Sequence, residues 1–302
     1  MNQENLAPVT LFVYARPVHT QRTIEALLKN PEAKFTDLIV YSDGARNNTD
    51  ISTVNQVREI IKKTSGFKSI KLIEREQNFG LAKNIISGVT EVTEEYGRVI
   101  VLEDDILTSP LFLNFMNSAL EKYKNSKRIW HISGWNYPLK DIDTFSDVFF
   151  WRVMNCWGWA TWKDRWSFFE KKPQMLKDTW EIDTISRFNL DGTHDFFSQI
   201  ENNMNGSLNT WAIFWYATIF SNHGLCLNPT SSFVYNIGND GSGENCGHRD
   251  IYKNILNQKK IRDWPTIIEE DINIVTAIKN FYISHRPKLV RRILSKIKRV
   301  FL

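Results

Sequence analysis

The first third of the chain alternates short apolar segments with longer amphipathic ones, and this alternation restricts the fold more than any other feature. The apolar segments are rich in β-branched residues, which favour strands, and the segments between them have helical periodicity. A helix between two strands of one sheet makes those strands parallel, with helices covering the sheet. We therefore predict an α/β fold. The predicted strands cover residues 9–15, 37–43, 70–75 and 98–105, and the predicted helices cover residues 18–29, 53–64 and 80–95.

Length and cysteine content restrict the class of protein. A chain of 302 residues with 42% hydrophobic residues can bury a large core, in one large domain or two modest ones. Cys156, Cys226 and Cys246 are odd in number and far apart, which fits neither a disulfide framework nor paired zinc ligands. The N-terminus has no signal-peptide pattern, and its apolar run is too short to span a membrane. We expect a cytoplasmic protein.

Positive charge is concentrated at the C-terminus. Residues 286–302 contain seven Lys or Arg and no acid, and the rest of the chain is mildly acidic. If this segment is helical, its apolar and basic residues fall on opposite faces, which suits the surface of an anionic membrane. We therefore predict peripheral attachment to the cytoplasmic face of the membrane. The alternatives are a terminal helix that docks on its own domain and a segment that binds nucleic acid. The mildly acidic body offers no basic surface that would support nucleic-acid binding.

Three carboxylates follow directly after the apolar strand 99–102, namely Glu103, Asp104 and Asp105. Ligands of open α/β sheets bind beyond the carboxyl ends of the strands. Clustered carboxylates repel one another unless a cation lies between them, and oxygen ligands favour Mg²⁺ or Mn²⁺. Capping of a following helix by Asp105 or Ser109 accounts for one acid and not for three. We predict a metal and nucleotide site here, since polar residues also follow the other strands: Arg16, Ser42, Asp43, Asn78 and Gly80.

The segment "QNFGLAKNI", residues 77–85, resembles a turn into a helix N-terminus. Asn78 and Gly80 can form the turn, and Lys83 lies one turn into the helix. Free N–H groups at such a terminus attract a diphosphate. A capped helix with no ligand has the same pattern, so both interpretations stay open for this segment taken alone.

These motifs, in this order, resemble a known family. "LFVYARP", "YSDG", "NFGLAKN" and "LEDD" are similar to a GT-A glycosyltransferase, including family 2-like transferases. The downstream "CWGWATW" and "NIGNDGSG" resemble a bacterial group related to the N-acetylglucosaminyltransferase I type. The resemblance covers roughly residues 9–250. It implies a Rossmann-like nucleotide-binding half with a mixed, mainly parallel sheet (1–105), an abutting acceptor half (106–250), and a helical C-terminal region with a basic tail (251–302).

The resemblance also implies roles for the residues at the strand ends. In this family, the positions of Arg16 and Asp43 contact the nucleotide and its base. The position of Asp105 binds the divalent metal that bridges the donor diphosphate. Glu103 and Asp104 would then hold sugar or ribose hydroxyls. These implied roles agree with the ligand site expected from the residues themselves.

Tryptophan is concentrated in the second half of the chain. Ten of the eleven Trp residues lie between Trp130 and Trp215. Aromatic faces stack on the C–H faces of sugars, although many of these rings are expected simply to fill the core. Following the family, Trp157, Gly158 and Trp159 border the donor sugar and the acceptor, and we add Trp211 as a further sugar-binding candidate.

The chain departs from the family pattern at the expected catalytic base. Inverting transfer needs a base that takes the proton of the acceptor hydroxyl. In the family a carboxylate stands beside the Trp pair matching Trp211 and Trp215, whereas here Asn209 and Ala212 are found. Asn is not a useful proton acceptor at neutral pH.

A second departure lies in the glycine-rich segment "NDGSGENCGH", residues 239–248. Relatives often have a metal-binding His where Asn245 stands, so we predict that His248 binds the metal instead. Asp240 and Glu244 are the candidate catalytic bases, and the segment is expected to close over bound donor. Three explanations of the missing acid stay open: a base supplied by Glu244, Asp240 or Asp164, a retaining mechanism, or an inactive chain.

We therefore predict a metal-dependent hexosyl- or N-acetylhexosaminyltransferase. It would move a sugar from a nucleotide-sugar donor, UDP-linked, to a glycan or lipid-linked acceptor in bacterial surface polysaccharide (lipopolysaccharide) synthesis, with inversion. The alternatives are a retaining transferase and a catalytically impaired carbohydrate-binding or scaffold protein. A receiver domain is too short and does not explain the Trp-rich half. A nucleotidyltransferase would need a glycine-rich phosphate loop, and "ARPVHTQR" has no glycine.

Overall fold

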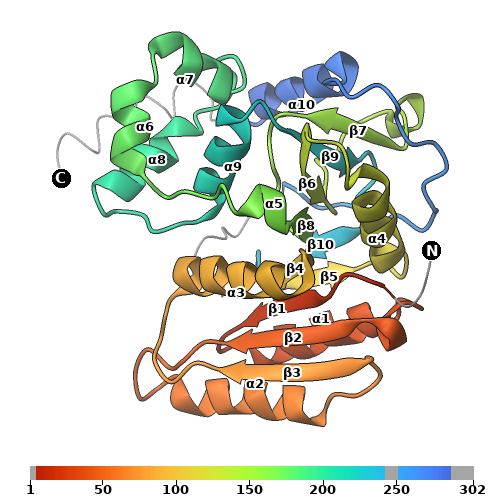
Figure 1. Ribbon diagram of the computed structural model, residues 1–302, viewed down its shortest axis with the longest axis vertical. Helices are drawn as coiled ribbons and strands as arrows, with labels where there is room; N and C mark the ends of the chain where they lie inside the picture. Colours follow the sequence, from red (N-terminus) through yellow and green to blue (C-terminus); the bar gives the residue numbers. More distant parts are fainter. Residues whose placement is uncertain (1–4, 242–250, 287–302) are drawn as a thin grey trace.

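A mixed sheet forms the centre of the molecule. The computed structural model describes residues 5–241 and 251–286, and in this part of the chain eight strands form one sheet in the order β3-β2-β1-β4-β8-β6-β9-β7 (Figure 1). The first four strands pair in parallel, which confirms the α/β prediction. Their bounds are β1 (Val9–Val13), β2 (Asp37–Ser42), β3 (Ser69–Glu74) and β4 (Arg98–Glu103).

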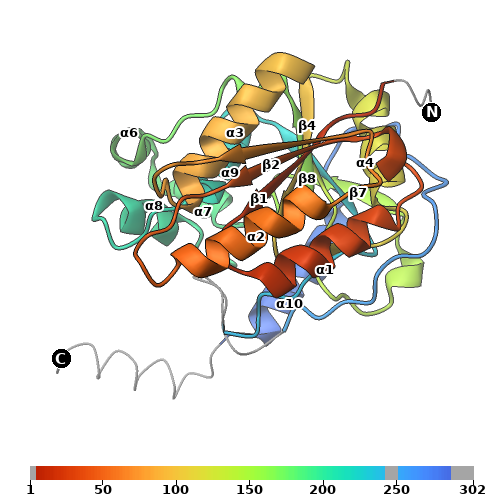
Figure 2. The same ribbon diagram turned by 90° about the horizontal axis from the view of Figure 1, so that it is seen from below.

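Helices cover both faces of this parallel part. α1 (Pro17–Leu28) and α2 (Ile51–Lys63) lie on one face and α3 (Leu81–Tyr96) on the other (Figure 2). In α3 the buried residues include Ile85, Val89 and Val92, a spacing that places them on one side of a helix. Gly97 ends α3 in a left-handed conformation (φ 77°) and turns the chain into β4.

The second half of the chain continues the same sheet. β8 (Trp159–Trp162) pairs antiparallel with β4, with Val101 opposite Trp159. A separate two-stranded ladder of β5 (Ile106–Thr108) and β10 (Val234–Asn236) follows the end of β4. The remaining strands are β6 (Ile129–Ser133), β7 (Val148–Trp151) and β9 (Leu225–Pro229).

Helices of the second half surround this extension. α4 (Phe112–Tyr123) contacts β6 and β8, and α9 (Ala212–Ser221) is buried along almost its whole length. The shorter helices are α5 (Lys163–Trp166), α6 (Pro173–Thr179), α7 (Ile182–Phe188) and α8 (Phe197–Met204), with 3₁₀ turns η1 (Ala33–Phe35) and η2 (Ile142–Thr144).

The C-terminal region contains a helix, as predicted, and this helix covers only part of the described residues. Residues 251–271 form an irregular segment, and α10 (Ile272–Ser284) begins only where the Asp271 side chain accepts hydrogen bonds from the backbone N–H groups of Asn273 and Ile274. The predicted basic tail lies outside the described residues. Within residues 5–241 and 251–286, none of the helices combines the length and apolarity needed to cross a bilayer.

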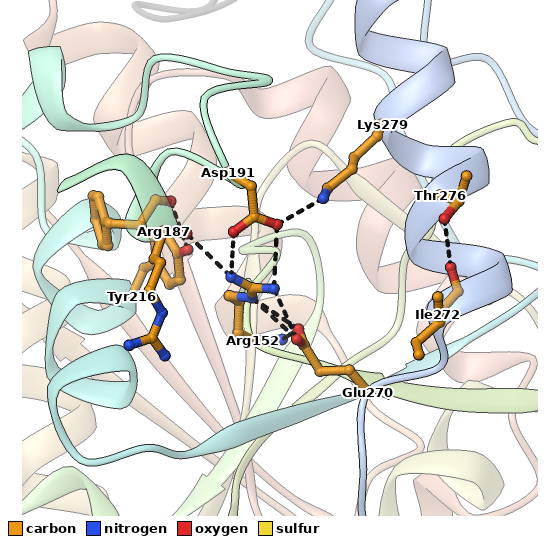
Figure 3. Close-up of polar contacts among 9 residues, drawn as sticks. Arg152, Arg187, Asp191, Tyr216, Glu270, Ile272, Thr276 and Lys279 are labelled. Carbon is orange, nitrogen blue, oxygen red and sulfur yellow. Dashed lines mark hydrogen bonds and ion pairs between the residues drawn. The ribbon is translucent and has the colours of Figure 1, made fainter. Parts of the chain in front are cut away.

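A half-buried arginine, Arg152, ties α10 to the second half (Figure 3). Arg152 follows β7 and donates to Glu270, with N–O distances of 2.9 to 3.2 Å, and to Asp191 at 3.0 Å. Lys279 of α10 reaches the same Asp191 at 2.6 Å. Glu270, just before α10, and Lys279, within it, are thus both joined to the second half by ion pairs.

Candidate functional site

Residues from two neighbouring strand ends meet at one rim of the sheet. Arg16 follows β1 and precedes α1, and Asp104 and Asp105 follow β4. The guanidinium Nη2 of Arg16 donates to Asp105 Oδ2 at 2.9 Å and also to an oxygen of Asp104. Thr23 Oγ1 donates to the Asp104 carbonyl at 2.7 Å and fixes α1 against this turn. The structure thus brings together three residues that the sequence placed at a ligand site.

The rim holds more negative charge than its arginine neutralises. Burial, reinforced by the charges of Asp105 and Asp104, raises the pKa of Glu103 to about 8. Burial also raises the pKa of Asp104 to about 6, although the charge of Arg16 opposes this shift. Burial disfavours the charged form of Arg16, but its ion pairs with Asp104 and Asp105 outweigh this effect and raise its pKa. A bound cation would relieve the repulsion among these carboxylates.

The rim fits a divalent cation that shares its ligands with phosphate. Mg²⁺ is usually bound by one or two carboxylates together with water and substrate phosphates. Asp105, the predicted metal ligand, and its neighbour Asp104, which the resemblance assigns to a sugar or ribose hydroxyl, supply such a pair. In the part of the chain that the structure describes, no three His, Cys, Asp or Glu side chains gather into a closed metal cage. The predicted ligand His248 lies outside the described residues.

Helix capping does not explain Asp105. The Oγ of Ser109 accepts the backbone N–H of Leu111 at 3.0 Å, just before α4. The Asp105 carboxylate faces Arg16 instead. α4 begins after Leu111 with no side-chain cap, so capping accounts for neither Asp105 nor Ser109.

The chain after β10 closes against Asp105. The Ile237 N–H donates to the Asp105 carbonyl at 2.9 Å, and a Cβ on Gly238 would lie 2.3 Å from Asp105 Oδ2, so any side chain there would displace the Asp105 carboxylate. Asp240 follows, with its carboxylate 3.1 Å from Nε2 of His19 in α1. Asp240 thus lies at the same rim as Asp105. The other predicted base, Glu244, lies outside the described residues.

His19 was missed by sequence reasoning. It lies one helical turn after Arg16 on α1, so helical spacing from the strand-end arginine could have identified it. Its pairing with Asp240 depends on the approach of a segment more than two hundred residues away, which no local pattern reveals.

Asp43 and Asn78 hold two loops together. Asp43 accepts the backbone N–H groups of Phe79 at 2.8 Å and Gly80 at 2.9 Å. The Asn78 amide donates to the Gly44 carbonyl at 2.7 Å and to Asp43 at 3.2 Å. These bonds join the loop after β2 to the turn that begins α3. This structural role was not predicted, and the donor contacts of both residues stay predictions.

Lys83 points to an aromatic neighbour. It is exposed near the start of α3, with its Nζ 4.1 Å from the centre of the Phe79 ring. Lys83 thus lies beside the turn that Asp43 holds through the Phe79 N–H. Its role in binding a diphosphate stays a prediction.

The predicted sugar-binding set separates into core and pocket residues. Trp159 and Trp211 are 1% and 2% exposed and stack on each other with ring centres 5.1 Å apart, so they pack in the core. Gly158 has a φ of 59° and packs closely against Val234. Trp157 precedes the strand and remains partly exposed. Among these residues, Trp157 is the ring best placed to contact a ligand.

Trp157 lines a pocket of about 230 Å³ in the second half. Its ring lies edge-on to Trp135 at 4.8 Å, and both rings contact Tyr252 at 5.6 to 5.7 Å. Ala212 lines the same pocket, and none of its described lining residues is an acid. Trp135 was not singled out from the sequence, although it follows β6 just as the rim residues follow their strands.

The chain is similar to a known protein family and to solved structures. A model of the GNT-I family matches residues 1–188. The search of curated proteins found no match. Among solved structures, the mannosyltransferase PcManGT from Pyrobaculum calidifontis, in complex with GDP-Man and Mn²⁺, is similar with a TM-score of 0.40 at 9% identity, over 73% of this chain and 70% of that one. S. aureus TarS is similar with a TM-score of 0.29 at 14% identity, over 42% of this chain and 21% of that one. The family match extends over more than half of the chain and includes the rim from Arg16 to Asp105.

Proposed function

The chain belongs to the GNT-I family and is therefore a glycosyltransferase of the GT-A type with a nucleotide-sugar donor, and we propose that it binds the donor diphosphate at the Arg16–Asp105 rim through Mn²⁺ or Mg²⁺. The observation that supports this most directly is the 2.9 Å contact between Arg16 and Asp105 at the carboxyl ends of β1 and β4. Ligands of open α/β sheets bind at such a place.

The residues of the rim suit a departing diphosphate. A cation held by Asp105 and Asp104 would neutralise charge on the leaving group. Arg16 adds a second positive charge, and its Nη1 is buried with no hydrogen-bond partner among the described residues. This free N–H can donate to a phosphate oxygen, which would satisfy an otherwise costly buried donor.

We further propose Asp240 as the catalytic base of an inverting reaction. Its carboxylate is 49% exposed at the rim and is restrained by His19. Asp164, the third acid considered, is instead ion-paired with Lys127 at 2.8 Å and with Arg165. Glu244 stays a sequence prediction.

The identity of the substrates rests on the sequence resemblance. A UDP-linked donor, a glycan or lipid-linked acceptor, and a place in bacterial surface polysaccharide synthesis are inferred from it. Contact of the basic tail with the cytoplasmic face of the membrane is likewise a prediction from the sequence.

Thermal unfolding with UDP tests the donor site. UDP with Mn²⁺ should raise the Tm, because a ligand that binds only the folded state stabilises it. Asp105→Asn should abolish this shift, since the amide cannot balance the cation's charge. Asp178→Asn on the surface of α6 is the matched control and should keep it. An unchanged Mn²⁺–UDP shift in Asp105→Asn would refute the assignment of the metal site.

Asp240→Asn should keep the Tm shift but lower turnover about 100-fold or more, the usual contribution of a base.

A catalytically impaired carbohydrate-binding protein is the second candidate function. It is favoured by Ala212, which lines the aromatic pocket where the family pattern has an acid nearby. Metal-dependent hydrolysis of nucleotide sugars distinguishes the two. Hydrolysis that is lost in Asp105→Asn supports the enzyme, and binding without any hydrolysis or transfer supports the impaired protein.

A further inference from the structure

We propose that the aromatic pocket is the acceptor subsite and that it binds an uncharged pyranose ring. This inference rests on the proposed function, because it takes the donor to lie at the Arg16–Asp105 rim. It goes further in assigning the pocket and the chemical class of the acceptor sugar. The residues that carry it are Trp135, Asn155, Trp157, Gln199 and Tyr252.

The pocket belongs to the second half of the chain but adjoins the donor rim. Its described lining residues all lie between Trp135 and Tyr252. The chain from Asn155 to Gly158 leads from the pocket to β4, because Trp159, the next residue, pairs with Val101 just before the acidic residues. A sugar in the pocket is therefore close to the strand end that carries the proposed metal ligands.

The segment 242–250 connects the two sites in sequence. The residue Asp240 on one side of it lies at the rim beside His19. The residue Tyr252 on the other side contacts the pocket rings of Trp135 and Trp157. In space, the rim and the pocket are joined through the pairing of β4 with β8.

The lining of the pocket matches a neutral sugar. Trp135, Trp157 and Tyr252 provide aromatic surfaces, and such surfaces pack against the apolar faces of ligands. None of the described lining residues is charged. A carboxylate or ammonium group would lose its hydration there without gaining a counter-ion. The volume of about 230 Å³ corresponds to roughly eight water molecules, which suits one monosaccharide.

Two hydrogen-bond donors on lining residues have no partner within residues 5–241 and 251–286. These donors are Trp135 Nε1 and Asn155 Nδ2, and the two residues are 4% and 9% exposed. Leaving a buried donor unpaired is costly, so an oxygen supplied by a ligand would stabilise this arrangement. Sugar hydroxyls supply such oxygens without a charge.

Binding of simple glycosides to the full chain tests the proposal. Methyl glucoside and methyl N-acetylglucosaminide should both bind in a saturation-transfer NMR titration, and methyl glucuronide should bind about tenfold more weakly or not at all. Trp157→Ala should weaken the neutral glycosides about tenfold, and Trp157→Phe, which keeps an aromatic ring, should weaken them less. Trp264→Phe, an aromatic substitution outside the pocket, is the matched control and should have little effect.

The outcomes separate this inference from the proposed function. Two results would overturn the acceptor pocket. One is methyl glucuronide binding as tightly as the neutral glycosides, and the other is neutral glycosides binding Trp157→Ala as tightly as wild type. If the Mn²⁺–UDP shift is present and requires Asp105 while no glycoside binds, the donor site stands and this inference fails. If glycosides bind as expected but Asp105→Asn keeps the Mn²⁺–UDP shift, the pocket stands and the donor assignment fails. Circular dichroism of each Trp157 variant shows that lost binding is not lost folding.

Discussion

At the scale of single residues, His131 explains why part of the Trp-rich half is core rather than binding surface. It is fully buried in β6, where its Nδ1 accepts the indole N–H of Trp215 at 3.2 Å and its Nε2 lies 3.1 Å from the Asn155 carbonyl. Its ring stacks on Trp159 at 5.3 Å. Since Nδ1 is an acceptor, the proton must be on Nε2. The neutral imidazole thus holds two tryptophans and the loop before Trp157 in place.

Acid should therefore destabilise the protein through His131. Burial lowers the pKa of His131 to about 3, although its hydrogen bond to Asn155 opposes this shift. The unfolded chain binds a proton below about pH 6.5 that the native state does not bind, so the free energy of unfolding falls as the pH decreases from about 6.5 toward 3. The contribution of this residue is at most about 1.4 kcal/mol per pH unit.

Urea unfolding of wild type and His131→Gln between pH 7 and pH 5 measures this effect. The variant should show a shallower loss of stability, and His285→Gln, which replaces an exposed histidine, should behave like wild type. Parallel stability profiles for wild type and His131→Gln would contradict the assignment.

At the scale of secondary-structure elements, α10 is attached by charge as well as by packing. Arg152 lies between Glu270 and Asp191, and Lys279 shares Asp191 (Figure 3). The helix also buries Ile274 and Ile278. Attachment matters for the pocket, since Tyr282 of this helix hydrogen-bonds to Tyr137 on the pocket wall.

Removing Arg152 should loosen α10. Arg152→Ala leaves the half-buried Glu270 without its arginine, while the exposed Asp191 keeps Lys279 at 2.6 Å. The free energy of unfolding should therefore fall by about 1–2 kcal/mol. Arg128→Ala is the matched control, because Arg128 is exposed and lines the same surface hollow as Arg152 and Glu270. It should change stability by less than about 0.5 kcal/mol. Hydrogen exchange is the measurement: amides of α10 should exchange faster in Arg152→Ala than in the control. Unchanged protection of α10 would show that packing alone holds it.

At the scale of the whole molecule, one sheet passes through both halves of the chain. β4 of the first half pairs with β8 of the second, so neither half can unfold without exposing a strand edge and core of the other. We expect a single cooperative unfolding transition. Tryptophan fluorescence reports mainly on residues 130–215, whereas far-ultraviolet circular dichroism reports on all helices and strands. The two signals should change at the same urea concentration, and separated midpoints would show independently folding halves.

The sequence alone determined the parallel strands, their covering helices, and the cluster of polar residues at the strand ends. These features are local, because side-chain periodicity and strand-end position follow from a few neighbouring residues. It also identified Arg16 and Asp105, which the fold places 2.9 Å apart. Only the tertiary structure decided that Trp159 is core while Trp157 lines a pocket, that Asp43 ties two loops, and that His19 meets Asp240. Each of these depends on contacts between segments far apart in the chain, and identical side chains become core or binding surface according to what packs against them.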